Sequence, residues 1–229
     1  MDGTPTIVCS RLIAELPATE RDRAATILAG CRTIEVEPAA PRFFAHFRAG
    51  ALLIVETGFV VLRSSDPAAL RSVITCEAGA GSILLAPSPE EILFGLESSR
   101  LTALDAAARA ELLKLPAAAA WIVEGLALAL AKRQEASGNL AATRHVERVR
   151  RTLLQLARTY GHADREGIRI DFPISHALLA EMVASSRETV TRALDELQRR
   201  GFVTRTGSTY WLRASPAVIA ARGADGARA

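Results

Sequence analysis

The stretch Ser175–Gly201, SHALLAEMVASSRETVTRALDELQRRG, decides the fold of the C-terminal part of this 229-residue chain. Ser175 can cap a first helix and Ser186 a second, because a serine hydroxyl accepts a hydrogen bond from the free N–H groups of a first helical turn. Between the two helices only Ala184 and Ser185 are left to make the connection. The pattern therefore predicts two helices joined by a tight turn.

The second of these helices has one apolar and one polar side. Val190, Leu194 and Leu197 fall at positions i, i+4 and i+7, so they form its buried stripe. Its opposite side presents, near the start of the helix, the polar residues Arg187, Glu188, Thr191 and Arg192. Arginine can bond to guanine O6 and N7, and a carboxylate can accept from cytosine N4. Such a surface is what a recognition helix needs in the major groove of DNA.

Two strand-like runs, Phe202–Arg205 and Tyr210–Arg213, flank residues 206–209. They predict a β-hairpin wing after Gly201, which is expected to end the helix. From residue 143 onward the chain has 15 arginines against 9 acidic residues, a net charge of +6, whereas the first 142 residues have 13 basic against 16 acidic residues, a net charge of −3. A basic domain joined to a mildly acidic one favours a polyanionic partner. A winged helix-turn-helix that binds DNA is the interpretation that joins these features.

Phosphate contacts are predicted for polar residues around the two helix starts. Hydroxyl groups and helix N-termini suit phosphate oxygens. The residues expected in this role are Ser175, His176, Ser186, Thr189 and Thr191. For His176 an ordinary surface position is an equally good interpretation.

The rest of the chain divides by its hydrophobic pattern. Residues 1–33 have apolar residues at helical spacing, and short apolar runs between Ile34 and Leu104 are separated by Gly, Pro, Ser and Asp, which is typical of a small antiparallel barrel. Helix formers dominate from Asp105 to Ala142. The predicted fold class is α+β: a β-roll or jelly-roll sensor barrel with its N-terminal helix (1–104), helices that include one long helix (105–142), the winged helix-turn-helix (143–215) and a tail (216–229).

One face of the long predicted helix steps by three or four residues. Small alanines at 127, 129 and 131 would let a second helix approach closely. The pattern alone leaves two interpretations open, a helix packed on its own barrel or the interface of a dimer.

Several classes of function lack support in the sequence. We find no Gly-rich phosphate loop, no metal-ligand spacing and no nucleophile–His–acid set, so we expect neither an enzyme nor a cofactor or metal site. Cys9, Cys31 and Cys76 are too far apart for a disulfide framework or a clustered site. No apolar stretch reaches the length of a membrane span and no secretory signal is visible, so we expect a cytoplasmic protein without membrane contact.

The order of barrel, long helix and winged helix-turn-helix resembles the family of the cyclic-AMP receptor protein and the fumarate-nitrate regulator (CRP/FNR), bacterial transcription regulators. Residues Ser185–Arg192 resemble its recognition helix, and Gly138–Ala141 with Arg151–Ala157 resemble its hinge and the following helix. The resemblance is specific over Leu126–Arg213 and architectural before that. It implies that Arg187, Glu188 and Arg192 read bases in half-sites of the TGTGA type.

The same resemblance makes the long helix a homodimer interface, with RNA polymerase as a further candidate partner. The interface residues it implies are Ile122, Leu126, Ala129, Leu130, Arg133, Ser137 and Leu140. One departure concerns the turn, where Ala184 stands in place of a frequent glycine. If the backbone has positive φ there, alanine costs about 1 kcal/mol.

The sensor barrel departs further from the family's cyclic-nucleotide binders. Residues 78–85 match the nucleotide-binding region, but residues 86–91 follow without the Arg-Ser or Arg-Thr pair that would hold the phosphate, and Arg133-Gln134 replaces a Thr-Ser pair on the long helix. A buried phosphate without an arginine would be uncompensated. We therefore expect no cyclic AMP and leave the effector unidentified. The scattered cysteines disfavour an iron–sulfur centre. His46 and Cys76 are residue types that can ligate haem, but no other feature of the sequence supports a haem site.

A different class of function remains as the alternative. The winged helix could belong to a protein-interaction or ligand-binding module that does not read DNA. The exposed set Arg187, Glu188 and Arg192 and the net charge of +6 argue against it. Steep salt dependence of binding would separate the two classes.

Overall fold

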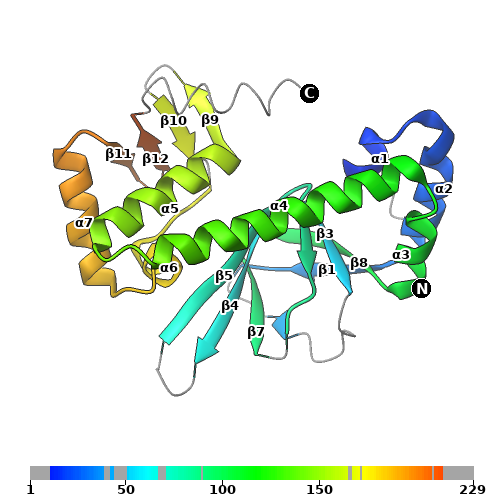
Figure 1. The fold of residues 1–229 in the computed structure, drawn as a ribbon, viewed down its shortest axis with the longest axis horizontal. Helices are drawn as coiled ribbons and strands as arrows, with labels where there is room; N and C mark the ends of the chain where they lie inside the picture. Colours follow the sequence, from blue (N-terminus) through cyan, green and yellow to red (C-terminus); the bar gives the residue numbers. More distant parts are fainter. Residues whose placement is uncertain are drawn as a thin grey trace. The chain divides into compact units, whose positions relative to one another are not determined.

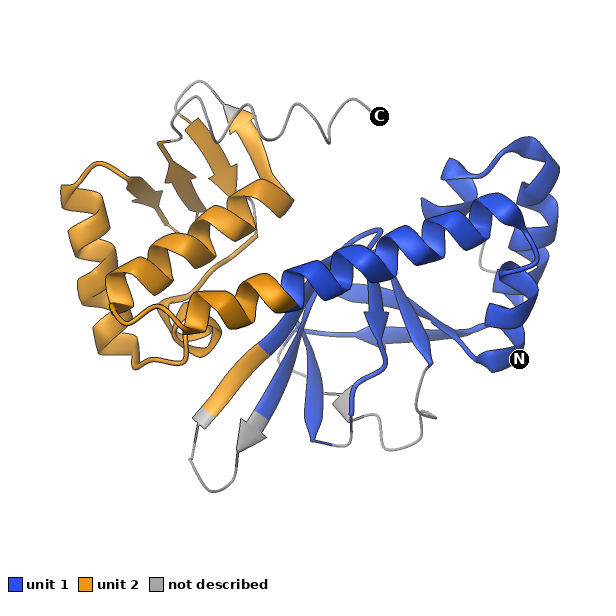
Figure 2. Cartoon of the chain, viewed as in Figure 1, with its two compact units in different colours: residues 1–65, 75–133 blue, residues 66–74, 134–229 orange. Residues whose placement is uncertain are grey.

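The computed structural model describes residues 11–38, 42–43, 51–66, 71–88, 90–164, 167–170, 172–207 and 209–213. The chain forms two compact units, residues 1–65 with 75–133 (unit 1) and residues 66–74 with 134–229 (unit 2), shown in Figure 2. The division falls within the long helix α4 (Pro116–Leu140), which is continuous through Arg133 and Gln134 (Figure 1).

Unit 1 contains the predicted barrel. Two four-stranded sheets have the strand orders β1-β8-β3-β6 and β2-β7-β4-β5. The pairs β1–β8, β3–β8, β3–β6, β2–β7 and β4–β7 are antiparallel. The strands are β1 (Arg32–Val36), β2 (Arg42–Phe43), β3 (Leu52–Thr57), β4 (Phe59–Asp66), β5 (Arg71–Gly79), β6 (Ile83–Leu85), β7 (Glu91–Gly95) and β8 (Ser99–Leu104). The helices are α1 (Arg11–Glu15), α2 (Ala18–Ala29), α3 (Ala106–Leu112) and the larger part of α4.

Alternation along β3 shows how this barrel is built. Leu53 and Val55 point into a core between the two sheets, whereas Leu52 and Ile54 point into a second core under the helices. All four side chains are buried, so β3 is apolar on both faces. The short continuous apolar run that predicted a strand thus reflects burial from two sides.

Helix α4 lies close to β6. A Cβ on Gly125 would lie 2.7 Å from Cδ1 of Ile83, so only glycine permits this approach without displacing a neighbour. Ile122 is 2% exposed within the same helical core, and Leu126 packs against that core. The first of the two interpretations of the long helix, packing on its own barrel, is therefore correct for this face.

Besides the end of α4, the described residues of unit 2 form three helices and a four-stranded sheet of order β11-β12-β10-β9. Its elements are α5 (His145–Tyr160), β9 (Gly161–Asp164), β10 (Gly167–Ile170), α6 (His176–Met182), α7 (Arg187–Arg199), β11 (Val203–Thr206) and β12 (Thr209–Leu212). Leu153, Leu179 and Leu194, one from each helix, are at most 2% exposed, and so is Tyr210 of β12. The predicted α+β class, with barrel, long helix and winged helix-turn-helix, is confirmed.

The helices predicted within residues 105–142 are α3 and α4: α3 ends at Leu112, and Pro116 starts α4 at the position where a proline is tolerated. Gly161 does more than end α5, since it begins β9, which pairs with β10. The wing strands extend to Thr206 and from Thr209, so the turn between them is two residues long.

No single helix in the described ranges is both long and apolar enough to span a membrane. Helices α3 and α4 meet the length and composition criteria only when taken together, across a bend of 119°.

Candidate nucleic-acid interface

Both predicted helix caps are present in unit 2. The Ser175 hydroxyl accepts a hydrogen bond from the Leu178 N–H at 3.0 Å, and α6 begins at the next residue. The Ser186 hydroxyl accepts from the Thr189 N–H at 3.2 Å, and α7 begins at Arg187. Each cap satisfies one of the N–H groups that a first helical turn leaves unpaired.

In the turn between α6 and α7, Ala184, which stands in place of the family's frequent glycine, has a left-handed backbone conformation. Ala184 has φ +47°, and among the described residues it is the only non-glycine with positive φ. Its N–H donates to Glu181 O at 3.4 Å, while the Ser185 N–H donates to Ala180 O at 2.9 Å. This pair of bonds is the Schellman motif, which usually has glycine in the left-handed position.

The same motif closes α7, and there the chain uses glycine. Gly201 has φ +68°, and its N–H donates to Gln198 O at 2.9 Å. The Phe202 N–H donates to Leu197 O at 3.0 Å. The two ends have the same geometry, so Ala184 is strained by about 1 kcal/mol where Gly201 is not.

Helix α5 supports the turn from its first residues. Arg148 Nη1 donates to Val183 O at 3.1 Å, directly before Ala184. His145 Nδ1 and Ser185 Oγ form a hydrogen bond at 3.1 Å. These partners are 35 and 40 residues apart, so no local spacing in the sequence predicted them.

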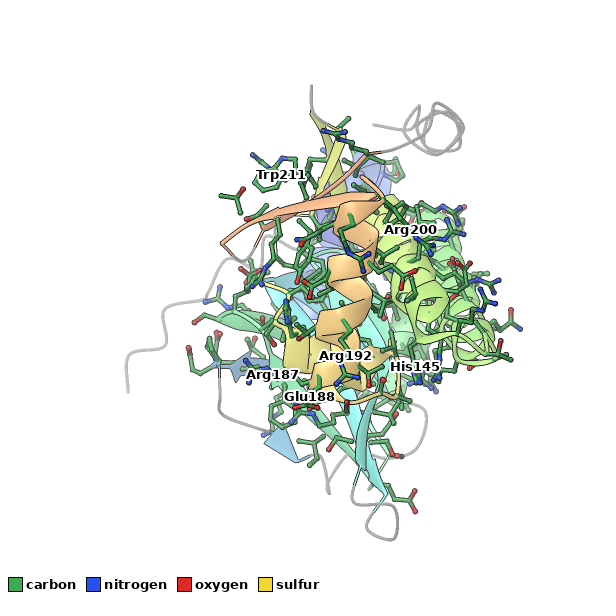
Figure 3. The ribbon with its side chains drawn as sticks, turned by 90° about the vertical axis from the view of Figure 1, so that its left-hand side faces the viewer. His145, Arg187, Glu188, Arg192, Arg200 and Trp211 are labelled. Atoms are coloured by element: carbon green, nitrogen blue, oxygen red, sulfur yellow. The ribbon has the colours of Figure 1, made fainter. Side chains whose placement is uncertain are left out.

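The polar face of α7 is open at its N-terminal end. Arg187, Glu188 and Arg192 are exposed and lie together there, whereas Arg200 lies toward the other end (Figure 3). Val190 and Leu197 on the opposite face are at most 1% exposed. Within the described residues neither Arg187 nor Arg192 has a hydrogen bond or an ion pair through its side chain. The predicted base-reading set is thus brought together and left available.

Glu188 is held in its ionised form. Its own backbone N–H and the Ser186 hydroxyl lower the pKa of its carboxyl group, and the positive charges of Arg187 and Arg192 add to the effect. An ionised carboxylate is purely an acceptor, which suits the cytosine amino group and not the guanine edge. The face therefore combines donors and one acceptor.

The predicted phosphate contacts fall into two groups. The Ser186 and Thr189 hydroxyls hydrogen-bond each other at 3.0 Å on the exposed rim. His176 has partners inside the protein instead, because its Nδ1 lies 2.9 Å from Thr191 Oγ1 and its Nε2 lies 2.9 Å from Nη1 of Arg205. The prediction gave Arg205 no role, although the arginine stands in the predicted wing.

The exposed face of α4 differs from the predicted one. Ile122 is buried in its own barrel, and Arg133 Nη2 lies 3.8 Å from Glu91 Oε1. Large exposed apolar side chains are instead Val123 at 61%, Leu128 at 54% and Leu130 at 59%, of which only Leu130 was predicted. Of the other predicted residues, Leu126, Ala129 and Leu140 are half-buried and Ser137 is exposed. The predicted residues do lie on one helix at helical spacing, but the side of α4 that is exposed to solvent is next to the predicted side.

Polar groups of the barrel near α4 interact with one another. Glu91 Oε1 accepts from the Thr75 hydroxyl at 2.6 Å and lies 3.8 Å from Nη2 of Arg133, while Glu91 Oε2 accepts from the Ser88 N–H at 3.1 Å. Lys132 is 7% exposed, and burial lowers the pKa of its ammonium group while the charge of Glu77 opposes that shift. These charges of unit 1 are balanced within the unit.

The cysteines of the described chain are unreactive thiols. Cys31 and Cys76 are both free, and burial raises the pKa of each thiol to about 11. A thiol with so high a pKa stays protonated at neutral pH and is a poor nucleophile. Cys9 and His46, weighed above for an iron–sulfur centre and for haem, lie outside the described residues.

Two capped helices, a tight turn and a following hairpin define unit 2 as a winged helix-turn-helix. Comparison with known proteins agrees. The family profile of the Crp-like helix-turn-helix domain matches residues 147–214. The global nitrogen regulator of Synechocystis sp. is 43% identical over 54 residues, which is 24% of either chain. A CRP-like cAMP-activated global transcriptional regulator of Mycobacterium tuberculosis is 33% identical over 92 residues, 38% of this chain and 41% of that one.

The likeness extends to the whole fold. A CooA mutant from Carboxydothermus hydrogenoformans superimposes with a TM-score of 0.71 at 18% identity, over 86% of this chain and 90% of the other. The sequence matches span less than half the length of the curated relatives, so they concern the C-terminal part, whereas the structural match covers barrel and helices together. Residues 147–214 thus form a Crp-like helix-turn-helix domain, and the whole chain has the fold of the solved structure it matches.

Proposed function

We propose that the chain acts as a homodimeric, sequence-specific DNA-binding regulator that reads a palindromic operator through the major groove. The observation that carries the proposal is the open end of α7, where Arg187, Glu188 and Arg192 are exposed and the two arginines have no ion pair with any described residue. With two arginines and one carboxylate, this end of α7 has a net positive charge, which favours an anionic partner.

The operator follows from the chemistry of these three side chains. Arginines can bond bidentately to guanines, and the Glu188 carboxylate can accept from cytosine. By resemblance to the family, half-sites of the TGTGA type are the natural match. Two symmetric recognition helices require half-sites whose centres are one turn of DNA apart, roughly 34 Å.

We place the dimer interface on the exposed strip of α4. Ala120, Val123, Ala127, Leu130 and Gln134 follow one another at intervals of three or four residues and are exposed. An apolar stripe with this spacing fits the seam between two parallel helices. Leu130→Glu should therefore yield monomers in analytical ultracentrifugation, whereas Leu113→Glu, at a 45% exposed site outside α4, should leave the dimer intact.

For the barrel we propose an effector other than cyclic AMP, or none. Glu91 stands in the segment where cyclic-nucleotide binders have an Arg-Ser or Arg-Thr pair, and Arg133, from the long helix, faces Glu91. An acidic side chain already paired within the barrel offers nothing to a phosphate. Isothermal titration with cyclic AMP should show no binding heat at millimolar ligand.

Selection of binding sites from a random duplex library tests the whole proposal. The purified chain is used with and without a panel of cyclic nucleotides at fixed, near-physiological salt. A two-fold symmetric site with TGTGA-like arms and no nucleotide requirement is the expected result. Recovery only with cyclic AMP would overturn the interpretation of the barrel. No enriched site, together with binding that hardly responds to salt, would favour the protein-interaction alternative.

A further inference from the structure

Three elements of unit 2 meet at the imidazole ring of His176. The residue begins α6, and its half-buried side chain reaches both the recognition helix and the wing. Nδ1 lies 2.9 Å from Oγ1 of Thr191 on α7. Nε2 lies 2.9 Å from Nη1 of Arg205 on β11. One side chain thus connects the three parts of a winged helix-turn-helix that would face DNA.

The hydrogen bonds allow only one protonation state of the ring. A guanidinium group can donate but cannot accept, so Nε2 must be the acceptor from Arg205. The ring is then neutral and has its hydrogen on Nδ1, which donates to Thr191 Oγ1. The Thr191 hydroxyl hydrogen is free to donate to the backbone oxygen of Arg187, which lies 2.9 Å away. All donors in this series point in the same direction, from the wing to the first turn of α7.

Arg205 is held without being neutralised. Its guanidinium carbon lies 5.4 Å from the centre of the Tyr210 ring, and its bond to the neutral His176 leaves its charge intact. The side chain is exposed, and within the described residues it has no carboxylate partner. Because an arginine offers five N–H donors and His176 takes one, donors remain for a phosphate.

We propose that His176 is a positioning residue for the DNA interface: it holds Arg205 of the wing as a phosphate contact and ties it to the first turn of the recognition helix. This inference rests on the proposed function. It also replaces the direct phosphate contact first predicted for His176, since a ring whose only N–H is used by Thr191 has no donor left for DNA.

Lowering the pH should break the hydrogen bond between Arg205 and His176. The groups that face the ring are Arg205 from the wing and Arg187 and Asp195 from α7. Burial is the main cause that lowers the pKa of His176, the two arginines add to it, and Asp195 opposes it. Below that pKa, Nε2 gains a hydrogen that points at a guanidinium donor, so the bond is lost. A histidine that bound phosphate directly would behave oppositely, because protonation would strengthen its contact.

Operator affinity measured between pH 7.5 and pH 5.5 at fixed salt tests the proposal. Four variants are compared with the wild type: His176→Gln, whose amide oxygen replaces the Nε2 acceptor; His176→Asn, which keeps only the Thr191 side; Arg205→Ala; and the double variant H176N/R205A. We expect Arg205→Ala to weaken binding about tenfold and to reduce the salt slope by about one. His176→Asn should weaken it similarly, and the double variant no further.

The conservative variant and the pH profile complete the test. His176→Gln should bind like the wild type at pH 7.5, while only the wild type weakens specifically as the pH falls through the pKa of His176, which lies below the ordinary value of 6.5. Additive losses in the double variant, or wild-type binding that strengthens in acid because of His176, would overturn the proposal. Thermal melting of each variant identifies any that fails to fold, and His176→Gln then still separates the two outcomes.

Nitrogen NMR of the free protein gives a readout that needs no DNA. At pH 7.5 the His176 ring should show a protonated Nδ1 and an unprotonated Nε2. A protonated Nε2 at that pH contradicts the proposal, whatever the protein binds. Conversely, absence of operator binding combined with the expected tautomer would refute the proposed function and the phosphate contact, while leaving the link between His176 and Arg205 in place.

Discussion

Two helices of unit 2 are rich in arginine and use it in opposite ways. On α5, Arg150 and Arg151 both donate to Glu147 at 2.9 Å, and Arg158 lies 3.5 Å from Glu135. On α7, Arg187 and Arg192 have no such partner in the described part of the chain. The count of arginines is thus a poor guide to an anion site, and their pairing is a better one. Paired arginines are structural, whereas exposed arginines without an ion pair remain available to an anionic partner.

The largest expected effect concerns the unpaired set. Arg192→Ala should lose about 2 kcal/mol of discrimination at one position of each half-site, since a bidentate contact to guanine is worth about 1–3 kcal/mol. Arg151→Ala, which removes the same charge from a paired position on α5, should leave sequence preference unchanged. Binding constants for the selected operator and its single-base variants, at one salt concentration, provide the measurement. If both substitutions had equal effects on sequence preference, the proposed difference between the paired arginines of α5 and the unpaired arginines of α7 would be wrong.

An intermediate effect is expected where α5 supports the turn. Arg148→Met keeps the aliphatic packing but removes the donor to Val183 O. Loss of a hydrogen bond to a charged donor destabilises by about 1.5–3 kcal/mol. Because the Arg148 Nε is buried without a partner, its removal offsets part of this loss, and we expect about 1 kcal/mol. Urea unfolding of the full chain checks the value, and an unchanged midpoint would show that the bond to the turn contributes nothing.

Ala184→Gly should have an effect of similar size and opposite sign. Glycine adopts φ +47° without the Cβ clash, which relieves about 1–2 kcal/mol, while its greater freedom in the unfolded chain takes back part of the gain. A net stabilisation of about 0.5–1 kcal/mol is expected from urea unfolding. The reverse change at the matching end of α7, Gly201→Ala, should destabilise by about the same amount. Destabilisation by Ala184→Gly would mean that the turn is unstrained.

The smallest effect is expected from acid titration of the paired set. Hydrogen bonds from Arg150 and Arg151 lower the pKa of Glu147 to about 2. Since the folded pKa lies below the ordinary value of 4.5, this carboxylate stabilises the fold above about pH 4.5, and the contribution is lost as the pH falls toward 2. The group is one-third exposed, so solvent screening reduces the contribution to below about 1 kcal/mol. In Glu147→Gln, the free energy of unfolding should fall less between pH 5 and pH 3 than in the wild type, and the difference should equal this contribution. An unchanged pH profile would contradict the prediction.

Local patterns allowed the fold of unit 2 to be predicted from the sequence. The hydroxyls of Ser175 and Ser186 cap the helices as predicted, because capping depends on residues three positions apart. The strand β9 was not predicted, because its residues GHAD lack the β-branched and aromatic side chains that indicate a strand. On α4 the spacing was recognised but the buried face was not, because residues at helical spacing mark a stripe without saying whether its own barrel or a second chain covers it.

The sequence by itself determined the order of elements, the two caps, the tight turn and the identity of the polar face on α7. These depend on spacings of a few residues, over which helix and strand geometry is regular. Only the tertiary structure decided which arginines are paired, that His176 joins Thr191 to Arg205, and that Ile122 belongs to the barrel. Such contacts join residues far apart in the chain, and their distances are set by how the elements pack.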